Sequence, residues 1–404
     1  MMLPLLIALL LFLGYLNANV AYIFLFSLIS GFSRPQQKKK NDKQNRFVLL
    51  YPAYKGDAVI LSSIKEGRNQ SYPNALFELL VIADKLKPET IAELKELGAQ
   101  VVEVNFENST KSKSLNAGLA TLSEKDYDYA VIMDIDNVMH PEFLENLNHG
   151  LADNPLIAQA HRVAKNMDTD MAILDALSEE INNSIFRKAH TQVGLSSALI
   201  GSGIAMQFLP FKTLMGEVQA IGGFDKEMEV RLLKAKEHID YIEYALVYDE
   251  KVQDAEIFEN QRKRWLSAQF HYLRNSFFDS LKALIFKGNI DYFNKVFQFL
   301  LLPRVLLLGL TFAVGGIALV LTLVYGFKEG YQNDFITINV RGLISLPLVV
   351  LFSLYQATPK YLRKKRTLVA LRQIPLTFWV LFRTLFKLKG ANKKFIHTPH
   401  SDKK

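Results

Sequence analysis

The sequence predicts an α/β domain with a parallel sheet, flanked by transmembrane helices. Hydrophobic residues make up 50% of the 404-residue chain and collect toward both ends, whereas residues 35–290 have the charged, mixed composition of a water-soluble domain. Between Phe47 and Pro155, short apolar runs alternate with periodic segments of helical length. This alternation is typical of βαβ units, and the long apolar ends are typical of membrane spans.

The composition narrows the range of partners. The formal net charge is +8, and basic runs at residues 34–46 and 360–366 lie beside the apolar ends. Because Lys and Arg next to spans mark the cytoplasmic side or contact anionic lipid, we expect membrane lipid, and no nucleic acid, as a partner. The chain has no cysteine, which excludes disulfides, thiolate metal sites and a cysteine nucleophile.

The first element is an N-terminal transmembrane helix over residues 1–33, followed by a basic cytosolic linker over 34–46. The apolar run is longer than the roughly 20 residues that cross a bilayer. A cleaved signal peptide is the alternative, but the start of the chain lacks Lys and Arg, and the apolar run continues past Asn19. We therefore expect an uncleaved span.

The soluble domain is expected at residues 47–265. Its first half holds four apolar runs of strand length, FVLLYPAY, FELLVIAD, VVEVNF and YAVIMDID, and the helix-like segment PETIAELKELG. Open parallel sheets bind ligands beyond the carboxyl ends of their strands. Asp84, Asp134 and Asp136 fall at such ends, so the sequence predicts a polar site at this edge of the sheet.

The C-terminal part predicts an interfacial helix region at 266–295, two transmembrane helices within 296–358, and an interfacial helix with a cytosolic tail at 359–404. The last segment carries Arg372 and Arg383, which favour a helix lying in the interface over a fourth crossing. Three crossings also keep the C-terminal lysines on the same side as the basic linker. The chain is thus expected to be a multi-pass cell-membrane protein with a cytosolic catalytic domain.

Two carboxylates form the first candidate site. Asp134 and Asp136 are two positions apart at the end of a buried strand, so their side chains point to the same face. Carboxylates without cysteine or a nearby histidine favour a hard cation, Mg²⁺ or Mn²⁺, which also binds phosphate oxygens. Ordinary solvated loop carboxylates are the alternative.

A series of motifs surrounds these carboxylates: YPAYKGD, VIAD, KSKSLNAGL, DID, GSGIAMQ, FDKEMEVRLL and QRKRW. In order and spacing they resemble the motifs of family-2 glycosyltransferases, which have the GT-A fold, a Rossmann-like nucleotide-diphospho-sugar transferase domain. The resemblance covers about residues 45–270. The apolar ends extend it toward the processive-type membrane synthases.

The resemblance implies which residues bind the nucleotide-sugar donor: Pro52, Tyr54, Asp84, Lys111, Asp134, Gln261 and Arg264. It also implies a metal held by Asp136 together with Asp134. The planar guanidinium of Arg264 suits diphosphate oxygens. Lys111 equally fits a solvated lysine at the start of a helix.

The acceptor side is implied by the same resemblance. Asp225 matches the general base that takes the proton of the acceptor hydroxyl, which gives an inverted product, and Trp265 matches the stacking floor for the acceptor sugar. Asp225 could instead cap a helix, with Glu227 or Glu229 as the base. Phe224 stands where the family has a glutamate. Trp265 could also anchor the chain at the membrane interface.

The C-terminal FIHTPH, which begins at Phe395, resembles the W-x-x-T gating element of related synthases, with phenylalanine in place of tryptophan. A short disordered tail fits this segment equally well.

The expected function is an inverting hexosyl- or N-acetylhexosaminyltransferase that moves a sugar from a nucleotide-diphospho-sugar, expected to be a UDP-sugar, to a glycan or lipid-linked acceptor in polysaccharide or oligosaccharide synthesis. The alternatives are a glycolipid-forming enzyme and an inactive nucleotide-sugar-binding membrane subunit. Phe224 keeps the inactive subunit open, but the presence of Asp134, Asp136, Asp225 and the Q-x-x-R-W residues argues against it. A transporter would carry more charges within its spans, where the sequence has only isolated cases such as Arg304.

Overall fold

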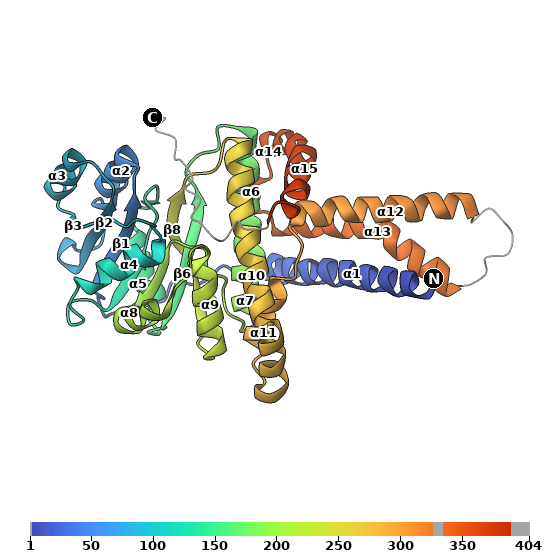
Figure 1. The fold of residues 1–404 in the computed structure, drawn as a ribbon, viewed down its shortest axis with the longest axis horizontal. Helices are drawn as coiled ribbons and strands as arrows, with labels where there is room; N and C mark the ends of the chain where they lie inside the picture. Colours follow the sequence, from blue (N-terminus) through green and yellow to red (C-terminus); the bar gives the residue numbers. More distant parts are fainter. Residues whose placement is uncertain (1, 326–333, 389–404) are drawn as a thin grey trace.

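The computed structural model describes residues 2–325 and 334–388, and it places an α/β domain at one end of three long helices (Figure 1). The long helices are α1 (Met2–Phe32), α12 (Arg304–Tyr325) and α13 (Asp334–Ala357). They project side by side from the domain, and a further long helix, α10 (Ala255–Lys287), runs across their base. The α/β domain flanked by apolar helices agrees with the predicted architecture.

The domain is built on one sheet with the strand order β3-β2-β1-β4-β7-β6-β8-β5. The first four strands of this order are parallel: β3 (Gln100–Val104), β2 (Phe77–Asp84), β1 (Phe47–Tyr54) and β4 (Tyr129–Ile132). They coincide with the four apolar runs that the sequence singles out. The chain moves from β1 outward to β3 and then returns to the other side of β1, which creates a topological switch point between β1 and β4.

The second half of the sheet is mixed. Strand β7 (Ile204–Gln207) is antiparallel to both of its neighbours, β4 and β6 (Ile157–Ala164). Strand β8 (Ile239–Asp249) runs parallel to β6, and the short β5 (Val138–Met139) pairs antiparallel with its end. As a result, the end of β8 lies near the turn that follows β4.

Helices cover both faces of the sheet. One buried apolar cluster joins a face of the sheet to α2 (Asp57–Gly67), α3 (Pro88–Glu96) and α5 (Phe143–Gly150). The cluster on the other face joins the sheet to α4 (Lys111–Ala120), α8 (Phe208–Glu217), α9 (Phe224–Lys234) and α11 (Ile290–Gln298). Strands that are buried on both faces explain the continuous apolar runs in the sequence.

The long helices meet the domain through a third apolar cluster. It combines residues of α1, α12 and α13 with residues of α6 (Asp170–Asn182), of the π-helical turn Asn183–Lys188 and of α7 (Ala189–Gln192). Farther from the domain, apolar side chains of the long helices are exposed, as at Leu5 and Val320. By length and composition, the described residues include three helices able to cross a membrane: Leu3–Phe32, Arg304–Val324 and Lys365–Leu385.

The last of these segments is held to the α/β domain at both of its ends. It consists of α14 (Lys365–Ala370) and α15 (Ile374–Leu385), which lie beside the base of the projecting helices (Figure 1). Near its start, Arg366 donates to the backbone oxygen of Asp168 at 2.9 Å. Near its end, Arg383 and Lys387 bind Glu259 of α10 at 2.6 and 2.8 Å.

Helix α10 differs from expectation at one boundary. The sequence placed the end of the soluble domain at residue 265, but α10 continues from Ala255 through this position to Lys287. It contains neither glycine nor proline, and it ends at Gly288, which adopts the left-handed conformation of a C-cap (φ 59°). The predicted C-terminal FIHTPH element lies outside the described residues.

Candidate active site

The candidate site lies at the switch point, where β1 and β4 end side by side. Tyr54 is the last residue of β1, and Asp134 follows β4 by two positions. A cavity of about 1170 Å³ is lined at this edge by nine of the ten residues that the sequence predicted for the site. These are Pro52, Tyr54, Lys111, Asp134, Asp136, Asp225, Gln261, Arg264 and Trp265.

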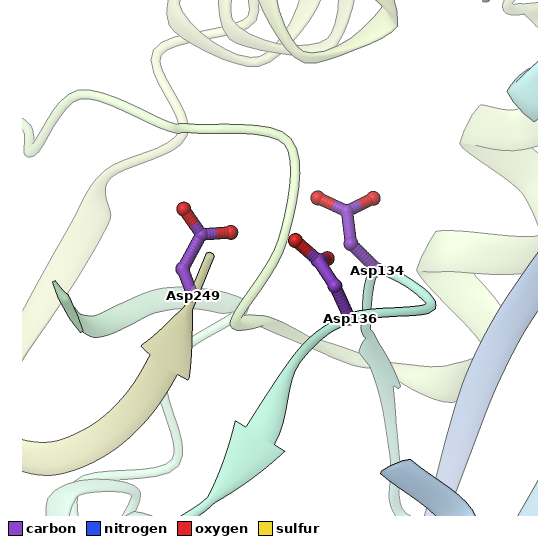
Figure 2. Close-up of side chains that lie close together, drawn as sticks. All are labelled: Asp134, Asp136 and Asp249. Atoms are coloured by element: carbon purple, nitrogen blue, oxygen red, sulfur yellow. The ribbon is translucent and has the colours of Figure 1, made fainter. Parts of the chain in front are cut away.

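Three carboxylates form an acid cluster in this cavity: Asp134, Asp136 and Asp249 (Figure 2). Each offers an oxygen, and these oxygens lie within 4.8 Å of one another. Asp134 and Asp136 come from the turn between β4 and β5, and Asp249 is the last residue of β8. The sequence predicted the first two as a metal site, and the fold adds the third.

The acid cluster fits a hard divalent cation. Its donors are all carboxylate oxygens, the ligand type that Mg²⁺ and Mn²⁺ prefer, and neither histidine nor cysteine belongs to it. Asp134 is partly accessible from the cavity, whereas Asp136 and Asp249 are buried. With three carboxylate oxygens this close to one another, Asp134, Asp136 and Asp249 would hold Mg²⁺ or Mn²⁺.

Asn137 connects the two halves of the acid cluster. Its fully buried side-chain amide donates to Asp249 Oδ1 at 3.0 Å and to Asp136 Oδ1 at 3.3 Å. Its side-chain oxygen accepts from the backbone N–H of Asp134 at 3.0 Å. One amide thus fixes the turn after β4 and ties it to the end of β8.

A buried ion network lies behind Asp249. Lys251 donates to Asp249 Oδ2 at 2.9 Å and to Glu179 Oε2 at 2.6 Å, and Arg162 binds both oxygens of Glu179 at 3.0 and 3.1 Å. Burial alone would raise the pKa of Glu179, but the charges of Arg162 and Lys251 hold this pKa well below its usual range. The Arg162 guanidinium also lies 3.9 Å from Asp134. The network keeps Glu179, Arg162 and Lys251 charged, and through Lys251 it holds the Asp249 carboxylate of the acid cluster in place.

Lys111 reaches the acid cluster from the first residue of α4. Its ammonium pairs with Asp134 and donates to the backbone oxygen of Gly201 at 2.7 Å. It also lies 5.1 Å from the ring centroid of Phe224, close enough for a cation–π contact. Phe224, which replaces the family glutamate, is therefore part of the wall beside Lys111. Contact of Lys111 with a donor remains a prediction.

Asp225 shares the cavity with the acid cluster, whereas the two alternative bases do not line it. Glu227 pairs with Arg231 at 2.9 Å. Glu229 is fully buried and pairs with Lys295 at 2.5 Å. Of the three acidic candidates, only Asp225 lines the cavity, and its role as the base remains a prediction.

Helix α10 supplies the Q-x-x-R-W residues. Burial lowers the pKa of the Arg264 guanidinium, and the charges of Asp134 and Asp225 act against this shift. Arg264 therefore stands in the field of both carboxylates. Gln261 lines the cavity, and its buried Oε1 has no hydrogen-bond partner among the described residues. Trp265 stacks with Arg262, whose guanidinium lies 4.4 Å from the ring centroid.

Asp84 is the predicted site residue that does not line the cavity. It ends β2, is fully buried, and neither of its side-chain oxygens is hydrogen-bonded to a described residue. Beside it, the ring of Tyr54 is flanked by the ammonium groups of Lys55 and Lys85 at 5.3 and 5.4 Å. A buried carboxylate without a donor partner is unfavourable. Contact of Asp84 with the nucleotide remains a prediction.

The site also contains residues that sequence reasoning missed. Asp249 could have been noticed as an acidic residue that ends an apolar run, the same signal that singled out Asp84. Asn137 directly follows the predicted carboxylates and could have been considered with them. Glu179 and Arg162 carry no such signal, because their contact depends on how α6 packs on β6.

Comparisons with known proteins identify a family and similar folds. The family described as glycosyltransferase like family 2 matches residues 45–268. Among solved structures, a mannosyltransferase from Pyrobaculum calidifontis in complex with GDP-Man and Mn²⁺ is similar at a TM-score of 0.51 and 12% identity, over 85% of this chain and 97% of that chain. TarS 1–349 of S. aureus in complex with UDP-GlcNAc is similar at a TM-score of 0.42 and 11% identity, over 86% of this chain and 90% of that chain. Curated protein sequences give no match.

The fold and the family prediction are both confirmed. The mixed sheet and its helices match the GT-A architecture of the Pyrobaculum calidifontis enzyme, a likeness that concerns the fold. The family match spans more than half of the chain, from just before β1 to beyond the Q-x-x-R-W residues, and the acid cluster lies within it. The chain therefore belongs to glycosyltransferase-like family 2, with a GT-A domain that carries a cluster of aspartates suited to a metal ion.

Proposed function

We propose that this chain is an inverting glycosyltransferase that moves a hexosyl or N-acetylhexosaminyl group from a UDP-sugar to a glycan or lipid-linked acceptor. Pro52, Tyr54 and Asp84 would hold the nucleotide at the ends of β1 and β2. Arg264 and Gln261 would bind the diphosphate from α10. The product would serve polysaccharide or oligosaccharide synthesis.

The observation that carries the proposal is the convergence of acidic residues from distant parts of the chain on one cavity. Asp134 and Asp136 follow β4, Asp249 ends β8, and Asp225 lies in the first turn of α9, yet all four line the same space. Leaving-group stabilisation and deprotonation of an acceptor need separate charged groups on opposite sides of one reacting carbon. This arrangement supports transfer chemistry over simple binding.

In the proposed reaction, Asp225 accepts the proton of an acceptor hydroxyl as that oxygen forms a bond to the anomeric carbon. The bond from this carbon to the diphosphate oxygen breaks, and its electron pair leaves with the nucleoside diphosphate. Arg264 would donate hydrogen bonds to the departing diphosphate, and Trp265 would stack against the acceptor sugar. A bound Mg²⁺ or Mn²⁺ would supply further charge stabilisation for the leaving group.

We further propose a cytosolic catalytic domain held against the membrane, with α1, α12 and α13 as crossings. These helices lie side by side (Figure 1), and apolar side chains on them are exposed; both observations support this assignment. The attachment of both ends of the segment 365–385 to the α/β domain supports an interfacial position for α14 and α15. The exposed Phe278 and Phe286 support the same position for α10.

The direct test is nucleoside diphosphate release by the detergent-purified protein from a panel of UDP-, GDP- and other nucleotide sugars. We expect release from a UDP-sugar that requires Mg²⁺ or Mn²⁺ and stops in excess chelator. Release in the presence of chelator would contradict a metal-dependent mechanism. Donor binding without release from any sugar, under all acceptor conditions, would instead favour an inactive nucleotide-sugar-binding subunit.

A further inference from the structure

The cavity that holds the acid cluster continues toward the projecting helices. Its volume of about 1170 Å³ exceeds the roughly 300–1,000 Å³ that is typical of a small-molecule pocket. Besides the acid cluster, it is lined by Ile23 of α1, Leu308 of α12 and Leu351 of α13. The reaction site is therefore joined to a space between the membrane-directed helices.

Arg304 stands where the polar lining meets the apolar lining. It is the first residue of α12, and its guanidinium donates to Asn182 Oδ1 at 2.7 Å, to the Ser178 backbone oxygen at 2.8 Å and to Ser178 Oγ at 2.9 Å. All three acceptors are neutral. Within residues 2–325 and 334–388, no carboxylate lies within ion-pair distance of this guanidinium. A partly buried cation that lacks an anion favours binding an anionic group.

A large part of the lining contributed by the C-terminal helices is apolar. It comprises side chains from α12, α13, α15 and the turn before α15: Val305, Leu308, Leu354, Leu371, Ile374 and Leu381. We call this part of the cavity the apolar passage. Beside it, Tyr355 of α13 and Leu368 of α14 also line the cavity and are 57% and 68% exposed, which places an entrance between these helices. The Arg363 guanidinium lies 4.3 Å from the Tyr355 ring centroid and adds a positive charge at this entrance.

We propose that the acceptor is an amphiphile whose phosphate group binds Arg304 and whose hydrocarbon chain lies in the apolar passage. The inference rests on the proposed glycosyltransferase function and specifies its acceptor. A neutral glycan offers no anion for Arg304, and no water-soluble glycan offers apolar surface for the passage, whereas burial of methylene groups favours a lipid tail. The phosphate could belong to a prenyl-type phosphate or to a diacyl phospholipid, and both share the recognised chemistry.

The headgroup test compares ligand pairs that differ by one phosphate. Binding of farnesyl phosphate, farnesol, dioleoylphosphatidic acid and dioleoylglycerol is measured on the full-length protein in detergent. In at least one of the two pairs, we expect the wild type to bind the lipid phosphate roughly tenfold more tightly than the matching alcohol. We expect Arg304→Gln to remove this preference. The pair that shows the preference identifies the lipid type. Equal binding of phosphate and alcohol by the wild type, or an unchanged preference in Arg304→Gln, overturns the proposal.

The passage test uses two substitutions on the same helix. Leu354 lines the apolar passage, whereas Leu348, also on α13, is 66% exposed and is not part of the lining. We expect Leu354→Trp to weaken binding of the preferred phosphate roughly tenfold or more, and Leu348→Trp to leave it unchanged. Equal binding by both variants and the wild type overturns the proposal. The two proposals can fail separately. If the wild type releases no nucleoside diphosphate from any nucleotide sugar but still binds the lipid phosphate at Arg304, the glycosyltransferase function is wrong and the lipid site is retained.

Discussion

Asn137 donates a 3.0 Å hydrogen bond to Asp249, a residue 112 positions later in the chain, and this contact joins the turn after β4 to the end of β8. The same side chain fixes the backbone at Asp134 and touches the carboxylate of Asp136. Because Asn137 contacts two carboxylates of the acid cluster and the backbone of the third residue, the amide is expected to control how well the cluster binds a cation.

We predict that Asn137→Ala weakens Mn²⁺ or Mg²⁺ binding roughly 10- to 100-fold, the usual effect of removing a partner that orients metal ligands. The measurement is the metal concentration that gives half-maximal release of nucleoside diphosphate. Asn69→Ala, at an exposed position, serves as the control. Equal metal dependence of the two variants would show that Asn137 does not position the ligands.

The buried pair of Glu179 and Lys251 leads to a stability prediction. Glu179→Gln leaves Arg162 and Lys251 buried with one counter-charge fewer, which typically costs about 3–5 kcal/mol. We expect a lower unfolding temperature for this variant in detergent, with Glu66→Gln on the exposed face of α2 as the control. A variant as stable as the wild type would mean that the ion network contributes no net stability.

The same pair predicts a pH dependence. The pKa of Glu179 in the folded protein lies below its ordinary value of 4.5, so ionised Glu179 stabilises the fold above about pH 4.5, and this contribution is lost as the pH falls toward the lower folded-state pKa. The stability difference between the wild type and Glu179→Gln should therefore be constant near neutral pH and shrink below pH 4.5. Thermal unfolding of both proteins from neutral pH to below pH 4.5 measures this stability difference. A difference that grows on acidification would contradict the predicted direction of the pKa shift of Glu179.

Much of the fold could be predicted from the sequence because its signals are local. The runs that become β1 and β2 are apolar, bounded by polar residues and of strand length, and both form as expected. The antiparallel position of β7 between β4 and β6 could not be predicted, since it depends on pairings between strands distant in the chain.

The site likewise contains some residues that the sequence could predict and others that it could not. Asp134 and Asp225 belong to recognisable motifs, whereas Asp249 joins the acid cluster only through the pairing of β8 with β6 and β5. Arg304 was noticed merely as an isolated charge in an apolar segment. Its partners Ser178 and Asn182 lie more than a hundred positions earlier, so its place in the cavity could not be inferred.

The two tryptophans of the chain allow a matched test of acceptor binding. Trp265 lines the cavity, whereas Trp379 on α15 is exposed and does not. We predict that Trp265→Ala raises the KM for the acceptor about tenfold, since losing a stacking contact of about 1.5 kcal/mol changes affinity by this factor. Trp379→Ala should leave this KM unchanged. If Trp265 is instead a membrane anchor, Trp265→Ala would leave the KM for the acceptor unchanged.

The absence of cysteine makes the topology directly measurable. Single cysteines at Lys40, in the basic linker, and at Lys387, after α15, are expected to react with a membrane-impermeant thiol reagent from the same side. A cysteine at Gln332, between α12 and α13 in the sequence, should react from the opposite side. Labelling of Lys40→Cys and Lys387→Cys from opposite sides would mean that the segment 365–385 crosses the membrane.

The most direct test of the proposed chemistry is a comparison of Asp225→Asn with Glu227→Gln, two carboxylate-to-amide changes near the start of α9. The measurement is single-turnover sugar transfer, with UDP binding recorded in parallel. We predict that Asp225→Asn lowers transfer by at least a hundredfold while UDP still binds, and that Glu227→Gln retains most of the activity, because Asp225 alone of the two lines the cavity. Wild-type transfer rates in Asp225→Asn would contradict its role as the base.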